Sequence, residues 1–347
     1  MRCIRCNSLD LCYGEVLHRW HSTYRIVCLL LLMALDISVA PAPQAGILSP
    51  SASKSEPIQP IPLEYNQDKA KVRLGTKLFF DPLLSVDGTY SCTTCHELRK
   101  GGIDNRKVPK LRHGVGNRNV PTLYNSRFNL AQVWDGRFKN IEEDTDATVT
   151  DPGGFNSTWP DVVKKLELNT HYNNSFKNAY SDGVTKKNII DAIATFVRSM
   201  VTINAPFDLY LRGDMSAISQ RAKLGYQHFK QYGCTACHNG VNVGGNMFQR
   251  IGVMRDYFAD RKDSITPDIG RMKFTGSEAN RYQFKVPSLR LVTRTPPYFH
   301  DGSVETLEEA IEIMGRYQLG KEIPPEHISL IIEFLGTLRG EYQGYKP

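Results

Sequence analysis

Apolar residues recur along this chain at the spacing of amphipathic helices rather than of strands. The segment 68–82 has an apolar face at helical spacing and stops at Pro82, which predicts a helix. Segments 187–201 and 220–233 show the same periodicity. Few stretches alternate with a period of two, so the predicted fold class is mostly α with little sheet.

The last part of the chain predicts two more helices. Thr306 and Glu309 form a capping-box pattern in front of the periodic segment 307–316. A pair of prolines then opens a helix that runs through Leu338. Gly- and Asn-rich loops lie between the central helices, which agrees with a helical fold joined by irregular connections.

Two short motifs share one pattern, in which a Cys-x-x-Cys pair is followed at once by histidine. Each motif comes soon after one of the predicted helices, 68–82 or 220–233. A helix and motif that occur twice are typical of a duplicated small domain. The motif residues are Cys92, Cys95 and His96 in the first copy and Cys234, Cys237 and His238 in the second.

A Cys-x-x-Cys pair serves in proteins as a redox dithiol, as half of a zinc site or as a haem tether. A zinc site needs four nearby ligands and a thioredoxin-like dithiol needs a βαβ context, and neither explains the following histidine. In a c-type haem site the thiols bind the haem vinyl groups and the histidine coordinates the iron. The sequence therefore predicts two covalent c-type haems, with His96 and His238 as proximal ligands.

The composition is that of an ordinary globular protein, and it narrows the choice of partners. The formal net charge of +7 mixes both signs along the chain, without the basic and aromatic stripe of a nucleic-acid surface. Nucleic-acid binding is therefore not expected. Of the eight cysteines, four lie before residue 30 and four belong to the two motifs, so none remains for a disulfide framework.

The first 45 residues have the pattern of a targeting segment. Arginines precede an apolar run at 26–40, and small residues follow it before a Pro- and Ser-rich stretch. The run is too short for a bilayer span of about 20 residues. We therefore predict export to the periplasm with the leader removed, and no stable membrane span in the mature chain. A retained N-terminal anchor is the alternative.

The length of 347 residues suits two domains of ordinary size. The prediction is a leader at 1–45, a flexible Pro/Ser-rich linker at 46–63 and two haem domains at 64–210 and 211–347. The boundary falls near the stretch APFDLYLRGD at 205–214.

From Leu74 to about Gly340 the sequence resembles the bacterial di-haem cytochrome c peroxidases. The resemblance rests on the motifs LGTKLFFDPLLS, SCTTCH, NVPTLYNSRFNLAQVWDGR, APFDLYLRGD, GCTACHNG, FKVPSLR and PPYFHDGSVETLEEAIEIMGRYQLG. It implies two cytochrome c-like domains, each with one covalent haem. Peroxide reacts in the N-terminal domain of such proteins, and the C-terminal domain transfers electrons.

The resemblance also implies distal iron ligands. Met314 corresponds to the distal ligand of the second haem, where a thioether stabilises ferrous iron and raises the potential. Related di-haem enzymes that oxidise side chains of a partner protein carry tyrosine there. His113 is the candidate for the ligand that caps the first haem at rest and leaves when the second is reduced. The alternatives are a core methionine at Met314 and an exposed loop histidine at His113.

The same resemblance implies roles for several further residues. Trp134 corresponds to the tryptophan between the haems, which serves electron transfer or packs as a brace. Asn119, with the carbonyls of Thr295 and Pro297, matches the positions that hold a calcium ion, and oxygen ligands suit that ion. His300 lies near the haem edges and need not bind metal.

The chain departs from the family at the group that moves a proton during peroxide cleavage. In the family a glutamate stands twenty residues after the inter-haem tryptophan and a glutamine ten residues after it. Here these positions are Gly154 and Asp144. Glycine has no acid or base, so Asp144 and Asp151 are the candidate substitutes. A solvated acidic loop is the alternative.

The predicted function is reduction of hydrogen peroxide to water. Electrons from a small soluble donor, a c-type cytochrome or a cupredoxin, enter at the His238/Met314 haem and pass by Trp134 to the His96 haem. One alternative is peroxide-dependent oxidation of a Trp or Tyr side chain on a partner protein. Another is a non-enzymatic electron carrier with both irons six-coordinate. Whether two chains pair as a homodimer stays open.

Overall fold

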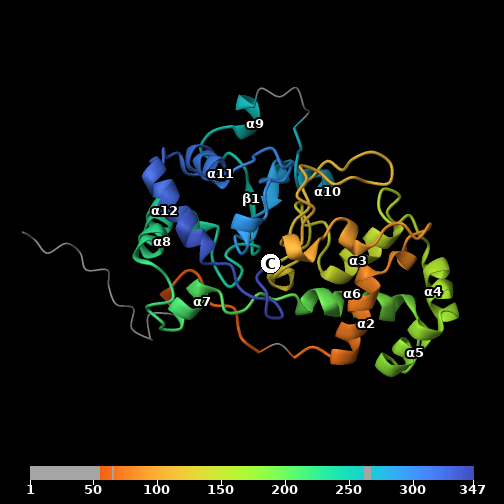
Figure 1. Cartoon of the computed structure of the whole chain (residues 1–347). Coiled ribbons are helices and arrows are strands. Elements are labelled where there is room, and N and C mark those ends of the chain that lie inside the picture. The colour runs from red at the N-terminus through yellow and green to blue at the C-terminus, as the bar shows by residue number, and fades with distance from the viewer. Residues whose placement is uncertain (1–54, 65, 262–266) are drawn as a thin grey trace, which may run out of the picture. The chain divides into compact units, whose positions relative to one another are not determined.

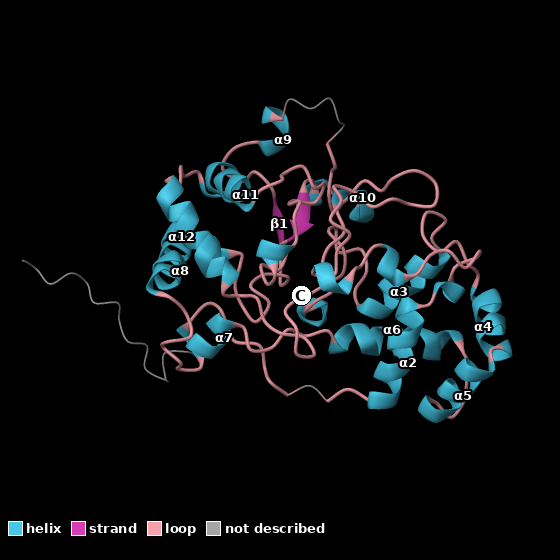
Figure 2. Ribbon diagram, in the orientation of Figure 1, coloured by secondary structure: helices cyan, strands magenta, loops and turns pink. Residues whose placement is uncertain are grey.

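Helices and connecting loops form almost all of the structure (Figure 1, Figure 2). The computed structural model describes residues 55–64, 66–261 and 267–347. All of them lie in the unit Leu48–Pro347. The predicted leader and the first part of the predicted linker lie outside the described residues.

The described residues contain eleven α-helices and one small sheet. The sheet has two antiparallel strands, β1 (Phe248–Arg250) and β2 (Gln283–Lys285), with Phe248 opposite Lys285. The predicted class, mostly α with little sheet, is therefore confirmed. The helices are α2 (Lys69–Phe80), α3 (Ile141–Thr150), α4 (Trp159–Leu168), α5 (Thr170–Ala179), α6 (Lys186–Ser199), α7 (Pro206–Leu211), α8 (Gln220–Tyr232), α9 (Tyr257–Asp260), α10 (Met272–Thr275), α11 (Leu307–Ile313) and α12 (Pro325–Gly336).

The helices predicted from periodicity are present, and their ends have local causes. The side chain of Asp68 accepts hydrogen bonds at the start of α2, and the chain leaves the helix just before Pro82. Thr306 caps α11 by accepting from the backbone N–H of Glu309. Helix α11 then passes at Met314 into a π-helix that the periodicity did not reveal.

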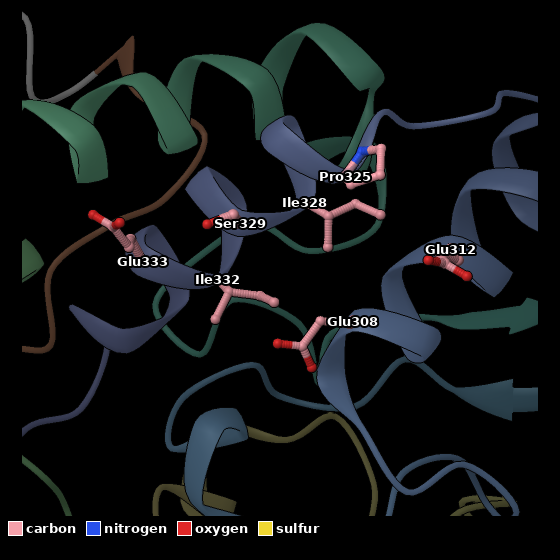
Figure 3. Close-up of a pocket in the computed structure, with 7 residues that line it drawn as sticks. All are labelled: Glu308, Glu312, Pro325, Ile328, Ser329, Ile332 and Glu333. Atoms are coloured by element: carbon pink, nitrogen blue, oxygen red, sulfur yellow. The ribbon is translucent and has the colours of Figure 1, made fainter.

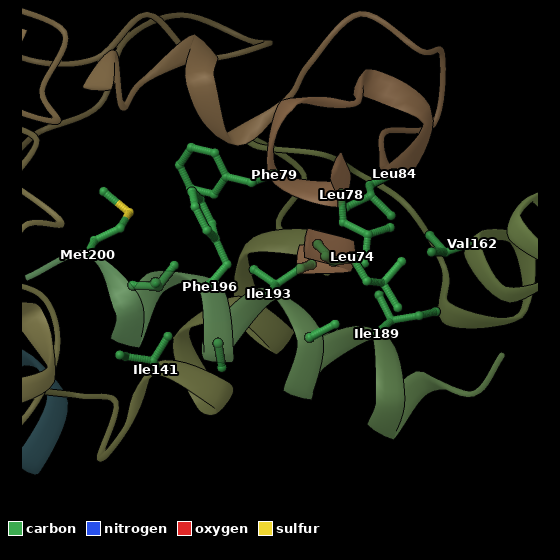
Figure 4. Packing of buried hydrophobic residues seen from close by; sticks show 14 of the residues in the cluster. Leu74, Leu78, Phe79, Leu84, Ile141, Val162, Ile189, Ile193, Phe196 and Met200 are labelled. Atoms are coloured by element: carbon green, nitrogen blue, oxygen red, sulfur yellow. The ribbon is translucent and has the colours of Figure 1, made fainter. Parts of the chain in front are cut away.

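One hydrophobic core forms where α2 packs against α6 (Figure 4). Leu74, Leu78 and Phe196 are almost fully buried there. The two helices approach closely at Gly75, where a Cβ atom would overlap the carbonyl oxygen of Ala192. Only glycine allows this contact between helix backbones.

A second core forms where α8 packs against α12. Phe229 and Phe334 are buried in it, with ring centroids 5.2 Å apart. Gly225 repeats the arrangement of the first core, because its Cβ atom would overlap the carbonyl oxygen of Leu330. The helix in front of each Cys-x-x-Cys-His motif therefore has a glycine at its crossing with a partner helix.

Membrane-spanning helices were sought in the part of the chain that the structure describes. None of these helices combines the length and the apolar character that a bilayer crossing requires.

Candidate functional site

The two Cys-x-x-Cys-His motifs adopt the same local structure. Each begins with a short 3₁₀ turn, Cys92–Thr94 in the first copy and Cys234–Ala236 in the second. In both copies the backbone N–H of the histidine donates to the carbonyl of the first cysteine at 2.9 Å. In both, the second cysteine donates to the same carbonyl at 3.3 Å. Each turn thus holds two thiols and one imidazole close together.

The imidazole of His96 is held through one ring nitrogen. Its Nδ1 donates to the carbonyl of Gly102 at 2.9 Å, which leaves Nε2 as the nitrogen with a free lone pair. Burial lowers the pKa of His96, so the ring is neutral at pH 7. A neutral, oriented imidazole is the form that binds iron.

His238 in the second motif is also a neutral imidazole. Burial lowers its pKa to about 4, although the nearby carbonyls of Val243 and Pro287 oppose this shift. Its Nδ1 is buried, yet it forms no hydrogen bond of normal geometry within the described residues.

The four motif thiols are free, and burial favours the protonated form of three of them. Burial raises the pKa of Cys92 and of Cys234 to about 12 and that of Cys95 to about 11. A zinc site requires thiolates. Within the described residues no group of three or more His, Cys, Asp or Glu side chains could hold a metal ion, so the zinc alternative has no support.

The motif side chains are enclosed by protein but not completely covered. Desolvation dominates the pKa shifts of Cys92, His96 and His238, so protein surrounds these groups. All three nevertheless keep some accessible surface. Paired thiols beside a neutral imidazole fit a covalently bound haem at each motif.

Trp134 lies where several distant segments meet. Its indole Nε1 donates to the carbonyl of Asn119 at 2.9 Å, and its ring centroid is 6.5 Å from that of His300. The backbone N–H of Asn119 donates to the carbonyl of His300 at 2.7 Å. The backbone N–H of Lys285, at the end of β2, donates to the Trp134 carbonyl at 2.8 Å. The structure therefore brings three predicted residues, Asn119, Trp134 and His300, together.

Buried charged residues form ion pairs next to Trp134. The guanidinium of Arg118 donates to Asp135 at 2.5 Å and to Asp268 at 2.6 Å. Asp135 directly follows Trp134 and is 1% exposed, and both Arg118 and Arg137 form ion pairs with it. His300 is also 1% exposed, and its Nδ1 has no hydrogen-bond partner among the described residues.

The two candidate carboxylates differ in environment. Asp151 is exposed, and its Oδ1 accepts from the backbone N–H of Gly153, so it stabilises its own turn. Asp144, on α3, is surrounded by protein, and burial raises its pKa to about 6. Its negative charge also acts on the thiol of Cys92. Of these two candidates, Asp144 is therefore the one that acts electrostatically on the first motif.

His113 lies exposed on a loop. The loop packs against the turn at Gly153 and Gly154, because the backbone N–H of Arg112 donates to Gly153 and its side chain to Gly154. The guanidinium of Arg112 also pairs with Asp87. In this arrangement His113 makes no described contact with the first motif, and its role as an iron ligand stays a prediction.

Met314 begins the π-helix Met314–Leu319, and its side chain is half-buried. Single π turns inside α-helices often mark functional sites, because they displace one residue from the regular helical path. Gly315 follows in close contact with Lys321 and Ile323. No described contact joins Met314 to His238, so ligation also stays a prediction.

The predicted calcium positions lie on neighbouring segments. Asn119 is 7% exposed, and its Nδ2 donates to the carbonyl of Arg106 at 2.9 Å. Its backbone contact with His300 joins it to the loop that carries Thr295 and Pro297. Uncharged oxygen donors suit a hard cation, and a calcium ion at these positions stays a prediction.

A surface groove of about 220 Å³ lies between α11 and α12 (Figure 3). Ile328 and Ile332 contribute apolar surface, and Glu308, Glu312 and Glu333 contribute carboxylates. No predicted site residue lines this groove, so it is separate from the motifs.

The family model described as "Di-haem cytochrome c peroxidase" matches residues 69–216. The chain is 41% identical over 309 residues to cytochrome c551 peroxidase of Nitrosomonas europaea, which covers 87% of this chain and 88% of that protein. The chain belongs to the di-haem cytochrome c peroxidase family. The assignment made from the motifs is confirmed, and the predicted enzyme class, a cytochrome-c peroxidase-type oxidoreductase, is that of these relatives.

Two further relatives and one solved structure are also similar to this chain. Cytochrome c peroxidase Ccp of Escherichia coli is 41% identical over 294 residues, covering 84% of this chain, but the chain spans only 63% of its length. Methylamine utilization protein MauG of Methylorubrum extorquens is 35% identical over 292 residues, 78% of each chain. A solved MauG-like protein associated with microbial copper homeostasis has the same fold, with a TM-score of 0.71 at 23% identity over 82% of this chain and 93% of that one.

Proposed function

We propose that this protein reduces hydrogen peroxide to water with electrons from a small soluble redox protein. The observation that carries the proposal is the pair of motif turns with matching hydrogen bonds, each holding two thiols beside a neutral imidazole. Each motif also follows a helix of a separate hydrophobic core, which supports two haem domains with a boundary near α7.

Cys92 and Cys95 would bind one haem covalently, and Cys234 and Cys237 the other. His96 and His238 would be the proximal ligands. Such haems supply iron that binds peroxide at the first site and carries electrons at the second. The reaction takes one hydrogen peroxide, two electrons and two protons to two waters.

The chain itself supplies proton transfer and electron positioning. Asp144 is the proposed proton-transfer group, because it is the candidate carboxylate that acts electrostatically on the first motif and has a pKa of about 6, close to neutral pH. Its carboxylate would accept a proton from peroxide and return it to the departing oxygen. Trp134 is the proposed path between the haems, and Met314 the distal ligand of the second haem.

The remaining proposals follow from the sequence. The donor is a c-type cytochrome or a cupredoxin, and the protein acts in the periplasm after removal of its leader. A calcium ion is held by Asn119 and the carbonyls of Thr295 and Pro297. His113 caps the first haem at rest and departs when the second haem is reduced, which requires its loop to leave the turn at Gly153 and Gly154.

The test starts with electronic and spin-resonance spectra of the oxidised and half-reduced protein, followed by one equivalent of peroxide. We expect the first haem to change from low-spin to high-spin on half-reduction, and the donor to become oxidised when peroxide is added. Turnover of many equivalents with a reduced donor supports the peroxidase. A first haem that is high-spin from the start removes the role of His113 as a cap. Two irons that stay six-coordinate and unreactive contradict the peroxidase and indicate an electron carrier.

A second candidate function is favoured by one departure from the family, Gly154 in place of the glutamate. Without that acid, peroxide would be cleaved slowly with ordinary donors, and the protein would oxidise a Trp or Tyr side chain of a specific partner. Peroxide consumption that requires one partner protein, and not a small donor, would distinguish it.

A further inference from the structure

The turn that follows the first Cys-x-x-Cys-His motif carries the acceptor of the proximal imidazole. The Nδ1 of His96 donates to the carbonyl of Gly102 at 2.9 Å. The backbone N–H of Gly102 donates to the carbonyl of Glu97 at 3.0 Å, and Glu97 pairs with Ile103 as an antiparallel bridge. Segment 97–103 is therefore a small closed turn, and its shape decides where the Gly102 carbonyl points.

Two successive glycines make this turn easy to deform. Gly101 and Gly102 both have left-handed backbone, with φ of 77° and 72°. Glycine adopts positive and negative φ about equally well, so these two residues offer little resistance to rotation. The direction of the Gly102 carbonyl, and with it the hydrogen bond of His96, therefore depends on contacts from outside the turn.

Two neighbouring side chains supply those contacts. The hydroxyl of Thr122 donates to the carbonyl of Gly101 at 2.6 Å. The hydroxyl of Tyr124 donates to the carbonyl of Leu98 at 3.1 Å. The ring of Tyr124 lies against Gly102, where an added Cβ would be 3.3 Å from the ring atom Cδ2. Tyr124, which is 1% exposed, thus holds the turn both through its hydroxyl and through its ring.

Tyr124 is itself held by a segment far along the chain. Its hydroxyl lies 2.7 Å from the hydroxyl of Tyr345, and its ring meets Tyr342 edge to face with centroids 5.5 Å apart. Tyr342 and Tyr345 are joined by two backbone hydrogen bonds of 2.8 and 3.1 Å. Glu341 and Ile203 exchange backbone hydrogen bonds of 2.6 and 2.9 Å, which anchor this segment. It therefore reaches, through Tyr124, the turn that orients the first proximal histidine.

This arrangement distinguishes the two motifs. The Nδ1 of His238 forms no hydrogen bond of normal geometry within the described residues, whereas the Nδ1 of His96 has an acceptor that other side chains hold in place. A hydrogen bond from this nitrogen orients a ligating imidazole and raises its basicity. A more basic ligand stabilises ferric iron relative to ferrous iron, so it lowers the reduction potential of the haem.

We propose that Tyr124 and Tyr345 are positioning residues, which hold the Gly102 carbonyl at His96 and thereby lower the reduction potential of the first haem. This inference rests on the part of the proposed function in which His96 is the proximal ligand, and not on the reduction of peroxide. The sequence patterns assigned no role to either tyrosine, although Tyr124 stands in the motif NVPTLYNSRFNLAQVWDGR.

The experiment compares Tyr124→Phe, Tyr345→Phe and the double variant Tyr124→Phe/Tyr345→Phe, all as the haem-loaded full chain. Each substitution removes a hydroxyl and keeps the ring, so the volume of the core is conserved. Tyr172→Phe is the matched control. Tyr172 is also a tyrosine of the first core, but its hydroxyl donates to Asp81 at 2.7 Å rather than to the turn.

The reduction potentials of both haems, measured by spectroelectrochemistry, give the first readout. In Tyr124→Phe we expect the first haem to shift about tenfold toward the ferrous form, the lower end of the effect of losing a group that orients a metal ligand. For one electron this is a rise of about 59 mV. Tyr345→Phe keeps the bond to Leu98 and should give a smaller rise. The double variant should match Tyr124→Phe, because both substitutions act through one hydroxyl. The second haem is the internal control and should keep its potential.

Hydrogen exchange of segment 97–103, followed by mass spectrometry, gives the second readout. Exchange at the backbone N–H of Gly102 requires the turn to open. We expect exchange about fivefold faster in Tyr124→Phe, which corresponds to the net contribution of one hydrogen bond. The increase should be smaller in Tyr345→Phe and absent in Tyr172→Phe.

The outcomes separate this inference from the proposed function. An unchanged first-haem potential in Tyr124→Phe, or an equal shift in both haems or in Tyr172→Phe, overturns the positioning role. Faster exchange without a change of potential also overturns it, because the turn then does not act on His96 as a ligand. A first-haem potential that shifts as expected in a protein without peroxide turnover overturns the proposed function and leaves the role of the two tyrosines intact.

Discussion

A fully buried ion pair joins three segments of the second core. Arg290 and Asp208 have side chains that are 0% exposed, and two parallel hydrogen bonds of 2.9 and 3.1 Å connect them. The Nε of Arg290 donates to the carbonyl of Val241 at 2.7 Å, and one terminal nitrogen also reaches the carbonyl of Gln59 at 3.3 Å. The pair thereby connects α7, the loop after His238 and the entry segment of the described chain.

The magnitude follows from complete burial. Asp208→Asn leaves a guanidinium without its countercharge inside the protein, and breaking a buried pair in this way costs about 3–5 kcal/mol. Replacing both partners by apolar residues, Arg290→Met with Asp208→Leu, removes both charges together. Such a double change is often neutral or stabilising. The double variant should therefore be more stable than Asp208→Asn, despite carrying more substitutions.

The assay is urea unfolding of the haem-loaded protein followed by circular dichroism, with the free energy of unfolding taken from the midpoint and slope. The control is Glu333→Gln, because Glu333 pairs with Arg221 at an exposed site. Losing an exposed pair costs under about 1 kcal/mol. If Asp208→Asn costs no more than Glu333→Gln, burial does not set the energy of this pair and the reasoning fails.

Three further predictions concern the helix crossing, the second haem and pH. Gly225→Ala should destabilise the protein by about 1–3 kcal/mol, because the new Cβ would overlap the carbonyl of Leu330. The control Gly336→Ala has open space around it and should be neutral or stabilising by up to about 1 kcal/mol. Equal effects of the two changes in urea unfolding would contradict the close helix crossing. Met314→Leu should lower the midpoint potential of the second haem and open its sixth position, and unchanged potentiometric and spin-resonance results would exclude ligation. Burial raises the pKa of Asp144 from 3.8 to about 6, so the ionised carboxylate destabilises the folded state above pH 6. The wild type should therefore gain stability relative to Asp144→Asn as the pH falls from 7.5 to 4.5. The gain should be at most about 3 kcal/mol. A pH-independent difference in unfolding free energy would contradict that shift.

Local sequence signals predicted the helices well. The N-cap at Asp68 and the stop before Pro82 are decided by neighbouring residues, so the pattern alone places α2. The π-helix at Met314 was not predicted, because the periodicity of 307–316 gives no sign of it. The close approaches at Gly75 and Gly225 were not predicted either, because the carbonyls that they meet belong to distant helices and are known only from the packing.

The sequence by itself determined the chemistry that depends on adjacent residues. Two thiols and an imidazole within five positions are held by one turn of backbone, so Cys-x-x-Cys-His indicates a haem tether in any helical context. The family also followed from sequence, because its motifs are contiguous.

Only the tertiary structure decided the relations between residues far apart in the chain. Asp144 and Asp151 look equivalent in sequence, and burial separates them, because one is surrounded by protein and the other caps its own exposed turn. The physical reason is that burial and Coulomb interactions depend on distance in space, which the order of residues does not specify.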